Sequence, residues 1–326
     1  MVSSNGSGAP PATLSLGGIF LDIYGLDQVN NASKITCLWL LHPRTYSRTV
    51  MGSFAWQIIN VAKERIAEPK HAVIALAFDL PNHGSRLIDR AATLEWSSGN
   101  RNHAIDLLGT VLRGRKDLSA LISCFEELYG RDRIQQHLVL GWSLGGHIAW
   151  QAWLWDQRIA AAVVVVGCPD LPGLLNYRAQ RSKLPLNGPF FGSVYFPDDL
   201  VEKCLQRDPK TFVFGTASAK PLRILPTDES EMKSVFDETI RGKSLLVCSG
   251  QDDELVPYAN TQPFLEFLQS SIREDGWYAD GKVRIEDRTY KGVGHEFSPE
   301  MVRDCTDWIM DIVLSPRNPR QKAELH

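Results

Sequence analysis

The chain has 326 residues, of which 44% are hydrophobic and 22% are charged, and its formal net charge is −3. This balance is typical of a globular protein with a sizeable core, and so small a charge favours neither a nucleic acid nor an anionic membrane as partner. No apolar run reaches the length of about 18 residues that a membrane span needs. Residues 1–12 lack the basic and apolar segments of a secretion signal. We therefore expect a cytoplasmic protein with a disordered tail at residues 1–12 and a charged tail at residues 317–326.

The six cysteines are spread along the chain without a CxxC pair. Reduced, buried thiols are therefore expected rather than disulfides. The chain also lacks an HExxH motif, other His/Cys ligand spacings and a phosphate-binding glycine loop. The sequence accordingly predicts no metal and no other cofactor.

Short apolar runs alternate with longer helix-like segments, which favours a mainly parallel sheet with helices on both faces. Strands are expected at residues 14–24, 34–41, 71–80, 136–141, 160–167, 244–250 and 283–290. Helices are expected at residues 51–67, 104–129 with a break near Gly114, 144–156, 258–273 and 299–313. The helix at residues 144–156 is apolar on nearly every side and should be buried.

The pattern loosens between residues 168 and 243, where many prolines occur and no strong strand is visible. An insertion of this length between two core strands indicates a cap or lid, because loops that long are usually functional. The predicted core is then made of residues 13–167 and 244–316. The insertion contains an aromatic group, Phe190, Phe191, Tyr195 and Phe196. Packing is the more common role for such side chains, and a substrate pocket is the alternative.

The most informative string is Gly-Trp-Ser-Leu-Gly-Gly at residues 141–146, which directly follows a predicted strand and precedes a predicted helix. A nucleophile on so tight a turn needs neighbours without bulk, and Gly141 and Gly145 meet that need. The helix N-terminus would also stabilise negative charge that develops at Ser143. Ser143 is therefore the predicted nucleophile, and the alternative is an ordinary serine in a glycine-rich turn.

A serine needs a base to take its proton, and three histidines follow Ser143 in the sequence. His147 lies one helical turn further on and should point along the helix, and His326 ends the charged tail. His295 stands in Gly-Val-Gly-His-Glu, a loop between the last strand and the last helix, where a solvent-reachable base is expected. His295 is the predicted base, with an ordinary surface histidine as the alternative.

The acid should lie between the serine and the histidine in the chain. The loop at residues 250–257 offers Asp252, Asp253 and Glu254 after a strand. Asp253 is the predicted acid, because G-x-x-D-x-x-V-P is a common spacing for such a loop. Asp170, which follows the strand at residues 160–167, is the rival, and each of these could instead be a solvated turn residue.

Gly-Trp-Ser-Leu-Gly-Gly, Gly-Gln-Asp-Asp-Glu-Leu-Val-Pro and Gly-Val-Gly-His-Glu, in this order among alternating strands and helices, resemble the α/β-hydrolase superfamily over residues 34–313. Two further stretches, D-x-x-x-H-G-x-R at residues 79–86 and W-x-x-G-N-x-x-H-A-x-D at residues 96–106, are similar to small, little-studied intracellular members. The resemblance implies an α/β-hydrolase fold with an inserted cap and no cofactor.

The resemblance also implies a serine hydrolase that cleaves a small-molecule carboxylic ester or thioester through an acyl-enzyme on Ser143. The same residues serve peptidases, acyltransferases and carbon–carbon bond hydrolases, and a non-catalytic ligand receptor can share the fold. These alternatives stay open at this point, as does the oligomeric state.

One departure from the superfamily concerns the oxyanion hole. Many members have His-Gly after the third strand, where this chain has His42-Pro43-Arg44. Proline has no N–H, so the predicted donors are the backbone N–H groups of Leu144 and Arg44. Further side chains could line the mouth of the site or order its loops: Trp142, His83, Arg86, Asn100, His103, Phe190 and Phe191.

Overall fold

The computed structural model describes residues 9–68, 70–214 and 229–315. The disordered tail predicted at residues 1–12 lies largely outside this range, although the first strand already begins at Ala12. The charged tail predicted at residues 317–326 lies wholly outside it.

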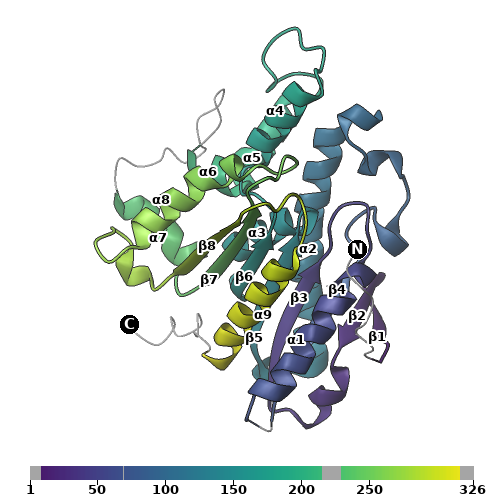
Figure 1. Ribbon diagram of the computed structural model, residues 1–326, viewed down its shortest axis with the longest axis vertical. Helices are drawn as coiled ribbons and strands as arrows, with labels where there is room; N and C mark the ends of the chain where they lie inside the picture. The colour runs from purple at the N-terminus through teal and green to yellow at the C-terminus, as the bar shows by residue number, and fades with distance from the viewer. Residues whose placement is uncertain (1–8, 69, 215–228, 316–326) are drawn as a thin grey trace.

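Within the described part of the chain, eight strands form one sheet in the order β1-β2-β4-β3-β5-β6-β7-β8 (Figure 1). The pairs β1–β2 and β2–β4 are antiparallel. The strands β4, β3, β5, β6, β7 and β8, in this order across the sheet, are parallel to one another. The mainly parallel sheet predicted from the sequence is confirmed. The strands are β1 (Ala12–Leu16), β2 (Ile19–Tyr24), β3 (Lys34–Leu41), β4 (His71–Phe78), β5 (Ile134–Trp142), β6 (Ile159–Val165), β7 (Ser244–Gly250) and β8 (Arg284–Tyr290).

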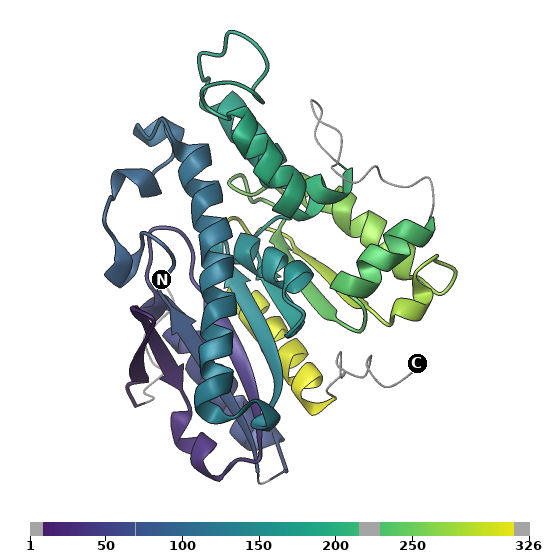
Figure 2. The same cartoon turned by 180° about the vertical axis from the view of Figure 1, so that it is seen from behind.

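Helices cover both faces of the sheet. On one face lie α1 (Gly52–Arg65) and α9 (Pro299–Leu314), which are in front in Figure 1. The other face, seen in Figure 2, carries α2 (His103–Tyr129), α3 (Leu144–Trp155) and α8 (Gln262–Ile272). Every residue of α3 from Leu144 to Leu154 is buried, as its apolar sequence predicts. The start of α9 is also confirmed, because the Ser298 side chain accepts a hydrogen bond from the backbone N–H of Met301.

Short 3-10 helices occupy several loops. They are η1 (Leu26–Asn31), η2 (Arg48–Met51), η3 (Gly84–Arg86), η4 (Ala91–Thr93), η5 (Trp96–Ser98), η6 (Arg131–Arg133), η7 (Tyr258–Asn260) and η8 (Ala279–Gly281).

The first expected strand, residues 14–24, is in fact a hairpin of β1 and β2. Gly17 and Gly18 join the two strands with φ values of 56° and 79°. Two successive residues with positive φ form the tight turn that Gly-Gly favours, because glycine has no Cβ to collide with the backbone. The prediction of one continuous strand was wrong because it ignored this turn signal.

The break expected near Gly114 is absent, since α2 runs through it as one helix of 27 residues. A Cβ atom at Gly114 would lie 2.7 Å from Cδ1 of Ile148 in α3. The glycine therefore serves the close approach of two helices rather than a kink. The prediction of a break was wrong because packing between α2 and α3 outweighs the low helix propensity of glycine.

Residues 168–243 lie between β6 and β7 and contain the described helices α4 (Leu171–Arg181), α5 (Asp198–Arg207), α6 (Pro209–Phe214) and α7 (Glu229–Thr239). Figure 1 shows α4 rising at the top of the molecule, away from the body of the sheet. That this segment acts as a cap stays a prediction.

Candidate active site

Ser143 occupies the turn between β5 and α3 with φ 54° and ψ −110°, a strained backbone for a residue with a side chain. Its N–H donates to the carbonyl oxygen of Val165 at 2.8 Å, which fixes the turn to the neighbouring strand. A Cβ atom at Gly141 would lie 2.0 Å from the carbonyl oxygen of Gly145. Gly141 is therefore required by this close approach, and Gly145 is required in turn because a Cβ atom there would lie 2.2 Å from the carbonyl oxygen of Leu41.

The three predicted triad side chains form a continuous relay. Oγ of Ser143 lies 2.7 Å from Nε2 of His295, and Nδ1 of His295 lies 2.8 Å from Oδ2 of Asp253. The other carboxylate oxygen of Asp253 accepts hydrogen bonds from the backbone N–H groups of Leu255 and Val256, both at 2.9 Å. The Asp253 side chain is 1% exposed and the His295 side chain 19% exposed. The acid is thus buried and oriented, while the imidazole remains open to solvent.

Two loops that are distant in sequence hold the acid and the base together. They follow the neighbouring parallel strands β7 and β8, so they emerge at the same edge of the sheet. The backbone N–H of Asp252 donates to the carbonyl oxygen of Val293 at 3.0 Å. A Cβ atom at Gly250 would lie 2.3 Å from that same oxygen. The glycine at the end of β7 therefore allows the base loop to pack directly on the acid loop.

The rival acid is engaged elsewhere. Asp170 caps the N-terminus of α4, where its side chain accepts the N–H of Gly173 at 2.9 Å and pairs with Lys210. Asp252 is exposed, and Glu254 pairs with Arg181 at 2.9 Å. Among these carboxylates the structure brings Asp253 to the imidazole of His295.

The rival base is also occupied. Nδ1 of His147 lies 3.0 Å from the carbonyl oxygen of Cys168, and burial lowers the pKa of His147 to about 3. The ring is therefore uncharged, and its Nδ1 is engaged with the Cys168 backbone rather than with Ser143. His326 lies outside the described residues.

The loop after β3, which carries the predicted oxyanion donor Arg44, begins beside the serine turn. A Cβ atom at Gly145 would come within 2.2 Å of the carbonyl oxygen of Leu41, so the loop after β3 begins against the turn. Leu144 is the first residue of α3, and its N–H has no acceptor inside the helix. No described group accepts a hydrogen bond from the N–H of Arg44. Neither predicted donor thus has a hydrogen-bond acceptor among the described residues, and their role in an oxyanion hole stays a prediction.

His42 fixes the start of this loop. Its Nδ1–H donates to the carbonyl oxygen of Pro43 at 2.8 Å, and its Nε2 accepts the N–H of Leu80 at 3.0 Å. Burial lowers the pKa of His42 to about 4, which keeps Nε2 available as an acceptor. Thr45 follows with φ 68°, a left-handed conformation that turns the chain sharply after Arg44.

His83, one of the expected mouth residues, is buried within the loop that follows β4. Its Nδ1–H donates to the carbonyl oxygen of Pro81 at 2.8 Å, and its ring centroid lies 5.5 Å from that of His42. Its Nε2 is buried without a hydrogen-bond partner among the described residues. The Asp79 carboxylate organises this loop by accepting from the N–H and hydroxyl of Ser85 and pairing with Arg48.

Asn100 holds the next loop together. Its amide donates to the carbonyl oxygen of Leu94 at 3.2 Å and to the carboxylate of Asp106 at 2.9 Å, and its side-chain oxygen accepts the N–H of Asn102. These contacts order the loop around η5.

The aromatic candidates divide into two groups. Trp142 packs toward the α1 and α9 face, between Tyr46 at 6.1 Å and Phe297 at 5.9 Å between ring centroids. Phe190 contacts Phe191 at 5.3 Å and Trp96 of η5 at 5.9 Å. The second group therefore packs residues 168–243 against the loop that Asn100 orders.

Arg178 is a residue that the sequence patterns did not single out. It lies in α4, and its guanidinium donates to the carbonyl oxygen of Leu255, two residues after the acid. It belongs to no motif, and only a contact between distant parts of the chain reveals it.

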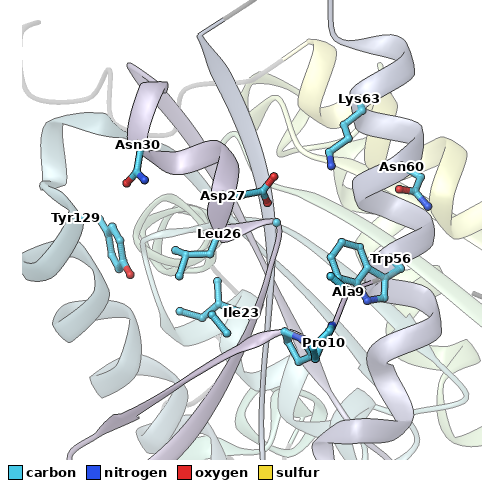
Figure 3. Close-up of a pocket in the computed structure, with 13 residues that line it drawn as sticks. Ala9, Pro10, Ile23, Leu26, Asp27, Asn30, Trp56, Asn60, Lys63 and Tyr129 are labelled. Atoms are coloured by element: carbon cyan, nitrogen blue, oxygen red, sulfur yellow. The ribbon is translucent and has the colours of Figure 1, made fainter. Parts of the chain in front are cut away.

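A surface pocket of about 810 Å³ lies elsewhere, beside the antiparallel edge of the sheet. Figure 3 shows Ile23, Leu26, Trp56, Lys63 and Tyr129 among its lining residues. These come from β2, η1, α1 and the end of α2, so the pocket does not include the relay. In the described part of the chain, no group of three or more His, Cys, Asp or Glu side chains is arranged to hold a metal ion, and no helix is long and apolar enough to cross a membrane.

Comparisons with known proteins identify the family of the chain and solved structures with a similar fold. The model of the Alpha/beta hydrolase family matches residues 40–304. No curated protein matches the chain at a significant level.

Similar solved structures share the fold at low sequence identity. TT1662 from Thermus thermophilus is 18% identical, with a TM-score of 0.57 over 92% of this chain and 96% of that one. Est1E from Butyrivibrio proteoclasticus, solved with ferulic acid, is 15% identical, with a TM-score of 0.51 over 93% and 98% of the two chains. The peroxisomal alpha-beta-hydrolase Lpx1 from Saccharomyces cerevisiae is 15% identical, with a TM-score of 0.51 over 98% and 88%.

Proposed function

From the premise that this chain belongs to the alpha/beta hydrolase family, we propose that it hydrolyses a small-molecule carboxylic ester or thioester through an acyl-enzyme on Ser143. The observation that carries the proposal is the unbroken relay, 2.7 Å from Ser143 to His295 and 2.8 Å from His295 to Asp253. Both distances lie within the range over which a base takes a proton directly. The cytoplasmic location predicted from the sequence stays a prediction.

In the first step, Oγ of Ser143 attacks the carbonyl carbon of the substrate while its proton passes to Nε2 of His295. Asp253 accepts the Nδ1–H of the same ring, which keeps Nε2 unprotonated before the attack and stabilises the imidazolium after it. The carbonyl oxygen becomes an oxyanion, and the N–H groups of Leu144 and Arg44 stabilise it.

In the second step, the carbon–oxygen or carbon–sulfur bond to the leaving group breaks, and His295 gives its proton to the departing atom. Water then attacks the acyl-enzyme and loses a proton to His295. The bond between the acyl carbon and Oγ of Ser143 breaks, His295 returns the proton to Oγ, and the acid product leaves the enzyme in its starting state. The 19% exposure of the His295 side chain supports this step, because the attacking water must reach the imidazole.

We also propose that residues 168–243 cover this site as a cap. Support comes from α4, since Arg178 binds the loop of the acid. Phe190 and Phe191, which belong to this cap, would then lie beside η5, within reach of an apolar part of the substrate.

A fluorophosphonate probe, which reacts only with an activated serine, tests the proposal. We expect one equivalent of label on the wild-type chain and none on Ser143→Ala with an unchanged melting temperature. The proposal is wrong if the folded Ser143→Ala variant still labels or keeps more than about a tenth of the wild-type rate on p-nitrophenyl esters. Labelling without ester turnover, but with acyl transfer to an added alcohol or thiol, would identify an acyltransferase instead.

A further inference from the structure

Among the residues that the structure describes, the guanidinium of Arg178 is bound only by neutral acceptors. Its Nη2 donates to the carbonyl oxygen of Leu255 at 3.0 Å, and its Nη1 lies 3.4 Å from Nε2 of His103. The His103 ring can accept this bond because its Nδ1–H donates to the carbonyl oxygen of Leu94 at 2.9 Å. Burial lowers the pKa of His103 to about 3, so the ring brings no charge of its own.

No described carboxylate lies within 4.0 Å of Arg178. The nearby Glu95 is already paired with Arg44, whose guanidinium also donates to the carbonyl oxygen of Thr93 at 2.8 Å. Asp253 is committed to His295 and to two backbone N–H groups. Within the described part of the chain, Arg178 thus carries a positive charge that no carboxylate pairs with at contact distance. Its side chain is only partly exposed, and burial lowers the pKa of the guanidinium.

Hydrogen bonds connect the Arg178 guanidinium to two loops of the candidate site. Arg178 binds Leu255, whose own N–H binds the carboxylate of Asp253. Through His103 it also reaches residues 93–95, to which Arg44 of the expected oxyanion loop is bound. The guanidinium of Arg178 therefore lies between the loop of the acid and the segment at residues 93–95, which binds Arg44.

We propose that Arg178 binds a carboxylate of the substrate, so that the site prefers esters or thioesters that carry a carboxylate in their acyl or alcohol part. This inference rests on the proposed hydrolase function. A single unmatched guanidinium fits the single charge of a carboxylate, which its planar fork can bind through two N–H groups. Two N–H bonds are free for this, one on each Nη atom, after the contacts to Leu255 and His103 are counted.

Matched pairs of esters test the proposal on each side of the scissile bond. For the acyl side, p-nitrophenyl hydrogen glutarate is compared with p-nitrophenyl methyl glutarate. For the alcohol side, 4-carboxyphenyl butyrate is compared with 4-(methoxycarbonyl)phenyl butyrate. Within each pair only the charge and one methyl group differ, and kcat/KM above the uncatalysed background gives a ratio of anionic to neutral ester.

We expect the wild-type ratio to exceed about 10 in one pair, and Arg178→Gln to lower that ratio by roughly 10- to 100-fold, mainly through KM. Arg181→Gln is the control, because Arg181 lies on the same helix, is exposed and pairs with Glu254. The control should leave the ratio unchanged.

If Arg178 only ties α4 to the acid loop, Arg178→Gln would slow both members of a pair equally and leave their ratio unchanged, which overturns the inference. Turnover of neutral esters without a preference in either pair also overturns it, while the proposed hydrolase function stands. Absence of both fluorophosphonate labelling and neutral-ester turnover would instead remove the proposed function, and this inference with it.

Discussion

The carbonyl oxygen of Leu41 lies 2.2 Å from where a Cβ atom on Gly145 would stand. The end of β3 and the turn that presents Ser143 are thus in direct backbone contact. Leu41 also pairs with Gly141 across β3 and β5. The sheet itself therefore fixes the start of the loop after β3 relative to the nucleophile.

Gly145→Ala should therefore damage both fold and activity. The added methyl group must displace backbone rather than a flexible side chain, and such overpacking costs about 1–3 kcal/mol of unfolding free energy. Gly109→Ala is the matched control, since nothing lies within 4 Å of a Cβ atom at that helical position. The control should gain up to about 1 kcal/mol from better helix propensity. Urea unfolding of the two variants checks the prediction, and equal stabilities would contradict it.

Asp253→Asn should reduce kcat on a p-nitrophenyl ester by roughly 10³- to 10⁴-fold. The amide cannot hold the imidazole of His295 in the tautomer that leaves Nε2 free to take the serine proton. Asp170→Asn, which changes a helix cap and its pairing with Lys210, should change kcat by less than about threefold. A larger loss from Asp170→Asn would assign the acid to the preceding strand.

Arg44→Pro should lose two to three orders of magnitude in kcat, because a missing oxyanion donor costs roughly 3 kcal/mol. Arg44→Ala keeps the backbone N–H and should stay within about tenfold, although it removes the ion pair with Glu95. Circular dichroism and melting curves must match before rates are compared. Full activity of a folded Arg44→Pro variant would place the donor elsewhere, with Thr45 as the next candidate.

The free energy of unfolding should fall as the pH drops from 7 to 5, and His147 should account for a measurable part of this loss. Burial lowers the pKa of His147 to about 3, whereas a histidine in the unfolded chain titrates near 6.5. Below about pH 6.5, His147 therefore binds a proton in the unfolded state but not in the folded state. This difference favours unfolding by about 2 kcal/mol at pH 5.

Urea unfolding of the wild type and His147→Gln at both pH values measures this share. The variant has no ring to protonate, so its stability should fall by about 2 kcal/mol less over the same interval. Parallel losses in the two proteins would show that His147 is not held neutral by the fold.

The sequence predicts this fold best where strands are buried on both faces. Residues 34–41 and 244–250 were expected as strands and form β3 and β7 with the same bounds, because their apolar runs end at clear polar or glycine boundaries. The hairpin at Gly17-Gly18 and the unbroken α2 were missed. The Gly-Gly turn was a local signal that the strand prediction ignored. The contact between Gly114 and Ile148, in contrast, depends on a partner helix that local composition does not specify.

In the candidate site, Ser143, Asp253 and His295 were predictable because strand-end loops carry recognisable spacings, and the structure places these side chains in one relay. Arg178 was not predictable. Its contacts with Leu255 and His103 join segments 77 and 75 residues apart, and no local pattern encodes a contact of that kind.

The attachment of α4 to the acid loop limits how the protein can be re-engineered. Tyr177 donates to the carbonyl oxygen of Glu254 at 3.3 Å, Arg181 binds the Glu254 carboxylate at 2.9 Å, and Arg178 binds Leu255. Grafting residues 168–243 from another hydrolase to change substrate range would remove all three donors at once. Such a chimera would need replacement donors at these positions on the grafted helix, because the inserted segment is also part of the support of the acid loop.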